Sequence, residues 1–271
     1  MGLILSLDNS IHSFNRAGFV GLLDQYTGAA AGYSLRKLSV NTTNVIRVRR
    51  SSDNAEDDFT ADEITDGTLL AWVGNTASDN GFVTTWYDQA GSNDATQGTA
   101  ASQPKIVDAG VLVEENGKPA ILPDGVDDIL IKTNTIDYQS IFAVGKPATN
   151  ASNNILLNIG LYFAWEADKV IYRSNTFSSH SFPSDSTQGL VSVIAEGASN
   201  PRSVNAYRNG VASTSNPISL NLGQSNAINI FGRLTGDYDS PIQEIIIFDT
   251  DQSSNRTGIE TNINDHYNIY P

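Results

Sequence analysis

The sequence predicts an all-β protein: a sandwich of two antiparallel sheets with short peripheral helices and a C-terminal helix. From about residue 81, apolar and polar residues alternate in short runs rich in β-branched and aromatic side chains. Gly, Asn, Asp or Pro bounds these runs, and no long helical segment alternates with them. This arrangement favours antiparallel pairing over a parallel α/β sheet.

The strands are predicted from the period-two pattern. They cover residues 82–87, 105–107, 120–122, 129–131, 140–144, 155–163, 169–172, 190–194, 204–207, 227–231 and 242–248. Asn209 and Gly210 lie between two such runs and both tolerate positive φ, so we expect a type I′ hairpin turn there.

Short helices are predicted on either side of the strand-rich region. Apolar residues between 18 and 38 have roughly helical spacing, interrupted by Gly28 and Gly32, which predicts a short helix followed by a turn. Thr60 and Glu63 have the spacing of a capping box, and a second helical patch follows at residues 69–73.

The C-terminal segment changes to a helical period. Ser253 or Ser254 is the predicted N-cap. Ile259, Ile263 and Tyr267 follow at i, i+4 and i+8, so this helix has one apolar face that we expect to dock on the sandwich.

Composition limits the domain organisation and the partners. The 271 residues are 39% hydrophobic and show no linker, which predicts an N-terminal arm over residues 1–20 and one domain over residues 21–271. The net charge of −14 repels phosphate backbones, so we expect no nucleic-acid partner. Cysteine is absent, which excludes disulfides and thiolate zinc sites. We expect no signal peptide at the start and no membrane insertion.

Three motifs in the first half carry a resemblance to an enzyme family. They are Ala31-Gly-Tyr-Ser-Leu-Arg-Lys-Leu38, the run 46–56, and Thr85-Trp-Tyr-Asp-Gln-Ala-Gly91 followed by Asn93-Asp-Ala-Thr-Gln97. Residues 27–104 resemble the catalytic domain of α-L-arabinofuranosidase B, glycoside hydrolase family 54. The Tyr-Asp-Gln-x-Gly run is the most specific element.

The second half is similar to the concanavalin A-like, laminin-G-type jelly roll. The motifs are Pro123-Asp-Gly-Val-Asp-Asp128, Ala206-Tyr-Arg-Asn-Gly-Val211, Ile230-Phe-Gly-Arg233 and Ile242-Gln-Glu-Ile-Ile-Ile-Phe248. The two signatures together resemble virion proteins of tailed bacteriophages. That resemblance implies a structural protein on the outer surface of a virion, or otherwise an extracellular one. Its implied partners are other virion proteins, further copies of the chain and host polysaccharide.

The hydrolase resemblance implies a catalytic pair of carboxylates. Retaining hydrolysis needs two carboxyl groups about 5 Å apart. Asp237 is the counterpart of the acid, and Glu166 is the residue offered as nucleophile by its strand. The cysteines beneath the sugar in that family are absent, which argues against catalysis.

A sugar subsite and a structural loop are both compatible with the most specific motif. Trp86 and Tyr87 offer aromatic faces, while Asp88, Gln89 and Asn93 offer polar groups for hydroxyls. Alternatively, the polar side chains bond to backbone groups and hold the loop, and this interpretation is favoured.

Two further charged groups have alternative explanations. Asp124, Asp127 and Asp128 flank a glycine and are a candidate calcium site, but solvated turn acids are favoured because the spacing is irregular. No other cofactor is expected. For Arg47 and Arg49, ion pairs with the acidic residues that follow are favoured over an anion site.

Two function hypotheses from different classes follow. The leading one is a non-enzymatic virion protein, in head decoration, a fibre or a tail, that binds host-surface carbohydrate. The alternative is a glycoside hydrolase of the α-L-arabinofuranosidase type.

Overall fold

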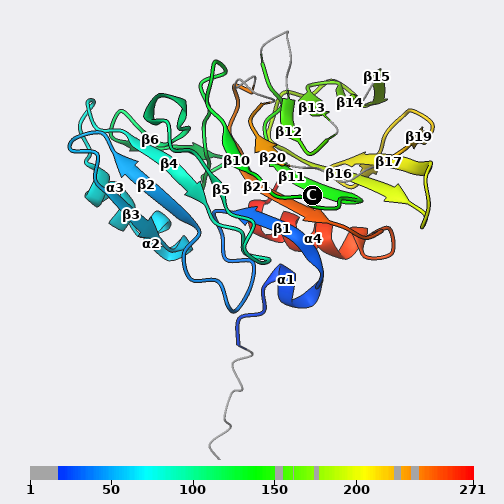
Figure 1. The fold of residues 1–271 in the computed structure, drawn as a ribbon, viewed down its shortest axis with the longest axis horizontal. Coiled ribbons are helices and arrows are strands. Elements are labelled where there is room, and N and C mark those ends of the chain that lie inside the picture. Colours follow the sequence, from blue (N-terminus) through cyan, green and yellow to red (C-terminus); the bar gives the residue numbers. More distant parts are fainter. Residues whose placement is uncertain (1–17, 150–154, 161, 174–176, 223–226, 233–237) are drawn as a thin grey trace, which may run out of the picture.

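Two large antiparallel sheets dominate the secondary structure of the described chain, with short helices around them (Figure 1). The structure is a computed structural model that describes residues 18–149, 155–160, 162–173, 177–222, 227–232 and 238–271. The all-β sandwich predicted from the sequence is confirmed.

The smaller sheet has seven strands in the order β1-β21-β11-β16-β17-β18, and β19 pairs with β17. β1 is an edge strand, and this position matters for the site described below. The strands are β1 (Ala29–Ser34), β11 (Ser140–Gly145), β16 (Gly189–Glu196), β17 (Arg202–Arg208), β18 (Val211–Ala212), β19 (Ile218–Leu220) and β21 (Ile242–Phe248).

The larger sheet has twelve strands in the order β15-β14-β13-β12-β20-β10-β5-β4-β2-β3, with β6 pairing β4 and β7. A separate pair joins β8 (Glu114–Glu115) to β9 (Lys118–Pro119). The twelve strands are β2 (Ile46–Arg50), β3 (Glu56–Phe59), β4 (Gly81–Trp86), β5 (Ala95–Thr96), β6 (Lys105–Asp108), β7 (Val111–Leu112), β10 (Leu130–Lys132), β12 (Ile155–Asn158), β13 (Tyr162–Glu166), β14 (Lys169–Arg173), β15 (Phe177–Ser181) and β20 (Ile228–Ile230).

The seven-stranded sheet is covered on both faces. Ile245 and Ile247 of β21 belong to the core cluster shared with the larger sheet, whereas Ile246 and Phe248 belong to a second cluster with the C-terminal helix. Successive side chains of a strand point to opposite faces, so both clusters are needed to bury the whole of β21. This explains why its sequence is a continuous apolar run rather than an alternating one.

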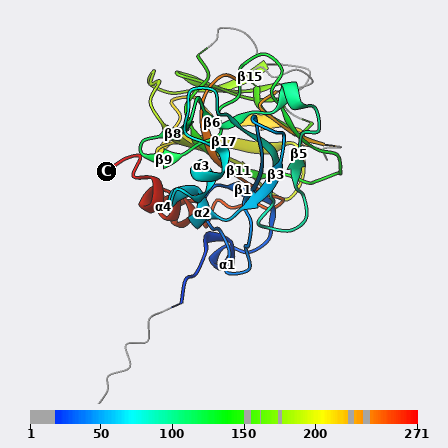
Figure 2. The same cartoon turned by 90° about the vertical axis from the view of Figure 1, so that its left-hand side faces the viewer.

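The helices are short except for the last one. They are α1 (Leu22–Gln25), α2 (Ala61–Thr65), α3 (Thr68–Val73) and α4 (Arg256–Tyr267), with a 3₁₀ turn at Ala100–Ser102. Figure 2 shows α2 and α3 beside β3, where the rings of Phe59 and Trp72 meet edge to face at 5.3 Å. No helix in these described ranges is long and apolar enough to cross a membrane.

The prediction for the C-terminal helix is confirmed in its packing and wrong at its start. Ile259, Ile263 and Tyr267 are buried against the seven-stranded sheet. However, the helix begins at Arg256 and its N-cap is Asn255. The backbone N–H of Ser253 instead donates to Asp251, in a turn that precedes the helix.

The capping box and the hairpin are both confirmed. Thr60 Oγ1 accepts from the backbone of Glu63, whose carboxylate accepts from Thr60 N. Asn209 and Gly210 both have positive φ, 52° and 76°.

Three strand predictions need correction. Residues 18–38 were expected to hold a short helix and a turn, but Ala29–Ser34 form β1, because β21 pairs with them. Residues 120–122 make only isolated bridges to Lys105 and Ile242. The segment 155–163 was expected to be one strand, but it contains β12 and the start of β13, with Gly160 at a φ of 82° between them.

Candidate functional site

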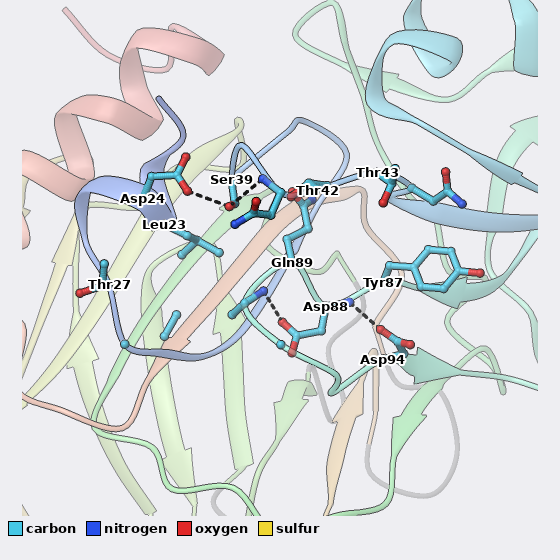
Figure 3. A pocket seen from close by; sticks show the side chains of 16 residues that line it. Leu23, Asp24, Thr27, Ser39, Thr42, Thr43, Tyr87, Asp88, Gln89 and Asp94 are labelled. Carbon is cyan, nitrogen blue, oxygen red and sulfur yellow. Dashed lines mark hydrogen bonds between the residues drawn. The ribbon is translucent and has the colours of Figure 1, made fainter. Parts of the chain in front are cut away.

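A cleft of about 910 Å³ opens where edge strand β1 of the smaller sheet meets the β2–β4–β5 part of the larger one. Three chain segments line it: the end of α1 with the start of β1, the β1–β2 loop, and the β4–β5 loop. Figure 3 shows Leu23, Asp24 and Thr27 on one side and Tyr87 and Thr43 on the other. The lining residues are Leu23, Asp24, Thr27–Ala29, Ser39, Asn41–Asn44, Tyr87–Gly91 and Asp94.

Asp88 fixes the β4–β5 loop to the edge of β1. Its Oδ1 accepts from the backbone N–H of Gly32 at 2.8 Å and of Ala90 at 2.9 Å, and its Oδ2 accepts from that of Asn93 at 2.9 Å. Burial raises the pKa of the Asp88 carboxyl above its ordinary value, against the effect of these three donors. The carboxylate is therefore occupied by the fold.

Gln89 is occupied in the same way. Its Oε1 accepts from Leu38 N at 2.7 Å and from Thr42 Oγ1 at 3.0 Å. Its Nε2 donates to the carbonyls of Ser34 and Arg36, both at 2.9 Å. Each end of the amide thus has two partners, and the side chain ties the β4–β5 loop to the segment after β1.

Asn93 closes this connection. Its side-chain Nδ2 donates to Ala30 O at 2.7 Å, and its backbone carbonyl accepts from the hydroxyl of Tyr33. The favoured alternative for this motif, that its polar side chains hold a loop, is confirmed by these hydrogen bonds. The loop satisfies edge groups of β1 that would otherwise need another partner.

The two aromatic residues of the motif have different environments. Trp86 is fully buried, stacked on Phe231 with ring centroids 6.5 Å apart and close to Tyr33. Its ring is therefore part of the core and not of the cleft surface. Tyr87 is half-buried and lines the cleft.

The Tyr87 ring is held from outside the cleft. Its hydroxyl donates to Asp58 Oδ1 at 2.6 Å, and Arg47 donates to both oxygens of Asp58 at 2.7 and 3.0 Å. Burial and the bond to Asp58 raise the pKa of Tyr87 to about 12. The ion pair predicted for Arg47 is confirmed, and it positions an aromatic side wall of the cleft.

Four polar side chains of the cleft have no hydrogen-bond partner within the described chain. They are Thr27 at the end of α1 and Asn41, Thr43 and Asn44 in the β1–β2 loop. The carboxylate of Asp94 has one oxygen with a partner and one without. Oδ1 accepts from Asp88 N at 2.9 Å, and no described residue donates to Oδ2. Thr27, Asn41, Thr43 and Asn44 lie in no motif of the sequence, and Asp94 lies in the quoted run 93–97 but was not identified as a binding residue.

Of the predicted catalytic pair, the structure describes only Glu166. Glu166 ends β13, where its carboxylate is 2.8 Å from the ammonium group of Lys169, and it does not line the cleft. Asp237 lies outside the described residues.

The predicted calcium ligands lie together in a tight turn. Oxygens of Asp124, Asp127 and Asp128 are all within 4.8 Å of one another. Asp124 Oδ1 accepts from the backbone of Val126, and Asp128 Oδ2 accepts from that of Asp124. Burial, and then the charge of Asp124, raise the pKa of Asp128 to about 7. Carboxylate oxygens suit Ca²⁺, and the calcium site stays a prediction.

Comparisons with known proteins add little to this description. No protein-family model and no curated protein matches the chain. Among solved structures, it is similar to Trypanosoma rangeli sialidase with 12% identity over 69% of this chain and 32% of that chain, at a TM-score of 0.48. The receptor-binding domain of botulinum neurotoxin type G has 14% identity over 83% of this chain and 51% of that chain, at a TM-score of 0.36.

The chain thus spans about a third of the sialidase and about half of the neurotoxin domain. At these identities and TM-scores the likenesses assign no activity. What the fold and the site define is an all-β sandwich with a polar, loop-built cleft at the junction of its two sheets.

Proposed function

We propose that the chain is a non-enzymatic carbohydrate-binding protein of a bacteriophage virion, with the cleft between α1, the β1–β2 loop and the β4–β5 loop as its saccharide site. One observation carries the binding part of this proposal. Hydroxyl and amide groups without partners in the described chain, together with one oxygen of Asp94 that accepts from no described residue, line the cleft beside the fixed ring of Tyr87.

This combination suits a saccharide chemically. Sugar hydroxyls both donate and accept, and so do the hydroxyl of Thr43 and the amides of Asn41 and Asn44. The apolar C–H face of a sugar ring packs on an aromatic ring such as that of Tyr87. A cleft of about 910 Å³ lies within the usual range of small-ligand sites, about 300–1,000 Å³.

The cleft supports binding better than hydrolysis. Retaining hydrolysis needs a carboxylate that is free to attack. Asp88 has three backbone donors, and Asp24 accepts from the backbone of Gly21 and Val40 at 2.8 Å and from Ser39 Oγ at 2.7 Å. Attack by either carboxylate would therefore break bonds of the fold. Asp94 is the one lining carboxylate with an oxygen that accepts from no described residue, whereas retaining hydrolysis needs a pair.

The virion part of the proposal is supported by the resemblance of the sequence motifs. In that role residues 1–20 attach the domain to other virion proteins or to further copies of the chain, on the outer surface of the particle. Phe19 and Val20, at the described end of this arm, are 54% and 63% exposed. Exposed apolar residues of this kind are typical of an interface. Deletion of residues 2–16 should abolish incorporation into particles, and normal incorporation would contradict the attachment role.

Binding is tested with the purified full-length protein on an array of oligosaccharides, followed by calorimetry with the strongest ligand. The variant Asn44→Ala should weaken binding at least about tenfold, since it removes a ligand-facing amide. Asn221→Ala, an exposed residue outside the cleft, is the matched control and should bind normally. Equal binding by Asn44→Ala and the control would show that the saccharide is not in this cleft.

A further inference from the structure

The charges that line the cleft are of one sign. Asp24, Asp88 and Asp94 contribute carboxylates, and no Lys, Arg or His is among the lining residues. The chain as a whole carries a net charge of −14, so the rest of the molecule does not offset this field. An anionic ligand entering the cleft meets repulsion without a compensating cation.

Two cations that act on residues of the cleft have partners in the fold. Arg47 binds both oxygens of Asp58 behind Tyr87. The bond from Ser39 and, as the smallest contribution, the charge of Lys37 lower the pKa of Asp24. The ammonium group of Lys37 lies over the ring of Phe19, 5.6 Å from the centroid, and Lys37 does not line the cleft. Neither group is placed to bind the carboxylate of an acidic sugar.

The three carboxylates differ in what they can offer a ligand. The carboxylates of Asp24 and Asp88 each accept three hydrogen bonds from other residues of the fold, and each oxygen has at least one donor. Asp94 accepts one bond, from Asp88 N, and its second oxygen has no donor among the described residues. Among the carboxylate oxygens of the cleft, this one has no donor in the described chain and is open to a hydrogen bond from a ligand hydroxyl.

We infer that the cleft binds uncharged, hydroxyl-rich saccharides and rejects saccharides that carry a carboxylate, with Asp94 as the residue that determines this specificity. The inference rests on the proposed function and deepens it. A sugar hydroxyl donates to Asp94, whereas a sugar carboxylate has no proton to donate and meets a like charge. Repulsion between like charges about 4 Å apart lowers the affinity about tenfold or more at the surface of a protein.

The test compares matched pairs of ligands on the full-length protein. Each pair has a neutral oligosaccharide and its counterpart with uronic or sialic acid, such as lactose and sialyl-lactose, and binding is measured at about 0.02 M and 0.3 M salt. We expect the neutral member to bind at least about tenfold more tightly at low salt. The ratio should shrink at high salt, where the Debye length is only several ångströms.

Asp94→Asn then tests the residue itself. The amide retains an oxygen for Asp88 N, so the loop should keep its structure. We expect acidic ligands to gain about tenfold in affinity while neutral ligands change by less than about threefold. Asp137→Asn, on an exposed residue outside the cleft, makes the same change in net charge and should leave the ratio unchanged.

The outcomes separate the two proposals. Binding of acidic ligands as tightly as neutral ones, or an unchanged ratio in Asp94→Asn, overturns the specificity and leaves carbohydrate binding in place. No binding of any saccharide overturns the proposed function and this inference with it.

Discussion

The β4–β5 loop and the β1–β2 loop contain the same kinds of side chain, yet the fold uses them in opposite ways. Asp88, Gln89 and Asn93 of the first loop bond to backbone groups of β1 and the segment after it. Thr43 and Asn44 of the second loop face the cleft without partners in the described chain. A specific polar motif therefore marks the scaffold of the site here. Most groups without partners lie outside that motif, and one oxygen of Asp94 is the exception.

The largest effect should come from the scaffold side. Asp88→Ala removes the acceptor for three backbone N–H groups, including that of Gly32 in β1. Each buried donor left unpaired costs about 1–3 kcal/mol, of which water entering the loop recovers part. We expect the free energy of unfolding to fall by about 3–4 kcal/mol in urea denaturation. A loss below about 1 kcal/mol would break the assignment of this motif to the scaffold.

A second prediction concerns Asp128, which lies outside both loops. Its carboxylate accepts a hydrogen bond from the backbone of Asp124, but burial and the charge of Asp124 disfavour its ionised form. The folded pKa of Asp128, about 7, is above the ordinary value of 3.8. The folded protein therefore holds a proton that the unfolded chain releases, and stability falls as the pH rises from about 4 to about 7. Asp128→Asn should remove this fall and stabilise the protein at pH 8 by about 2 kcal/mol relative to the unsubstituted chain.

Thermal or urea unfolding of both proteins from pH 4 to pH 8 isolates this contribution, because carboxylates with lowered pKa values contribute equally to both. A constant difference between the two proteins would contradict the raised pKa. Calcium chloride at pH 8 tests the predicted calcium site in the same assay. Binding to the ionised turn should raise the unfolding midpoint of the unsubstituted protein, and no change would contradict the site.

The sequence predicted strands whose own residues alternate or are apolar throughout. It missed β1, which is a strand because of contacts with residues distant in the chain. β11 and β17 alternate or are apolar throughout, so their burial follows from their own residues. β1 has the sequence Ala-Ala-Ala-Gly-Tyr-Ser, with few β-branched residues, and it is a strand because β21 and the β4–β5 loop supply its hydrogen bonds. Those partners are more than fifty positions away in the chain.

Some residues of the site could be predicted from the sequence and others could not. Tyr87 was found because it is an aromatic residue of the most specific motif, at the end of the predicted strand 82–87. Asn44 could not be found, because a lone Asn in a loop is compatible with any surface turn. Asp94 lies within the quoted run 93–97, but nothing in that run shows which of its side chains has a free oxygen. Trp86 was offered as a stacking surface, but its position within β4, on the inner face, places it in the core.

Two substitutions of Tyr87 distinguish the role of its ring from that of its hydroxyl, and the effect on stability should be smaller here. Tyr87→Phe removes the bond to Asp58 while Arg47 still pairs with that carboxylate. We expect a loss of about 1 kcal/mol in unfolding free energy and saccharide affinity within about threefold, because the aromatic face is retained. Tyr87→Ala should instead weaken binding strongly. If Tyr87→Phe weakens binding as much as Tyr87→Ala, the hydroxyl and not the face contacts the ligand.

The smallest effect on stability should come from the ligand-facing side. The double variant Thr43→Ala, Asn44→Ala removes a hydroxyl and an amide that bond to no described residue, and Thr43 is exposed. Surface substitutions of this kind change the unfolding free energy by about 0.5 kcal/mol or less. Gln89→Ala, in the opposite wall, is the matched comparison, since it loses four hydrogen bonds and should cost about 2–3 kcal/mol. Both proteins should bind saccharide poorly, but only the double variant should do so with a native urea midpoint. A destabilised double variant would mean that Thr43 and Asn44 also belong to the scaffold, and the difference between the two loops would disappear.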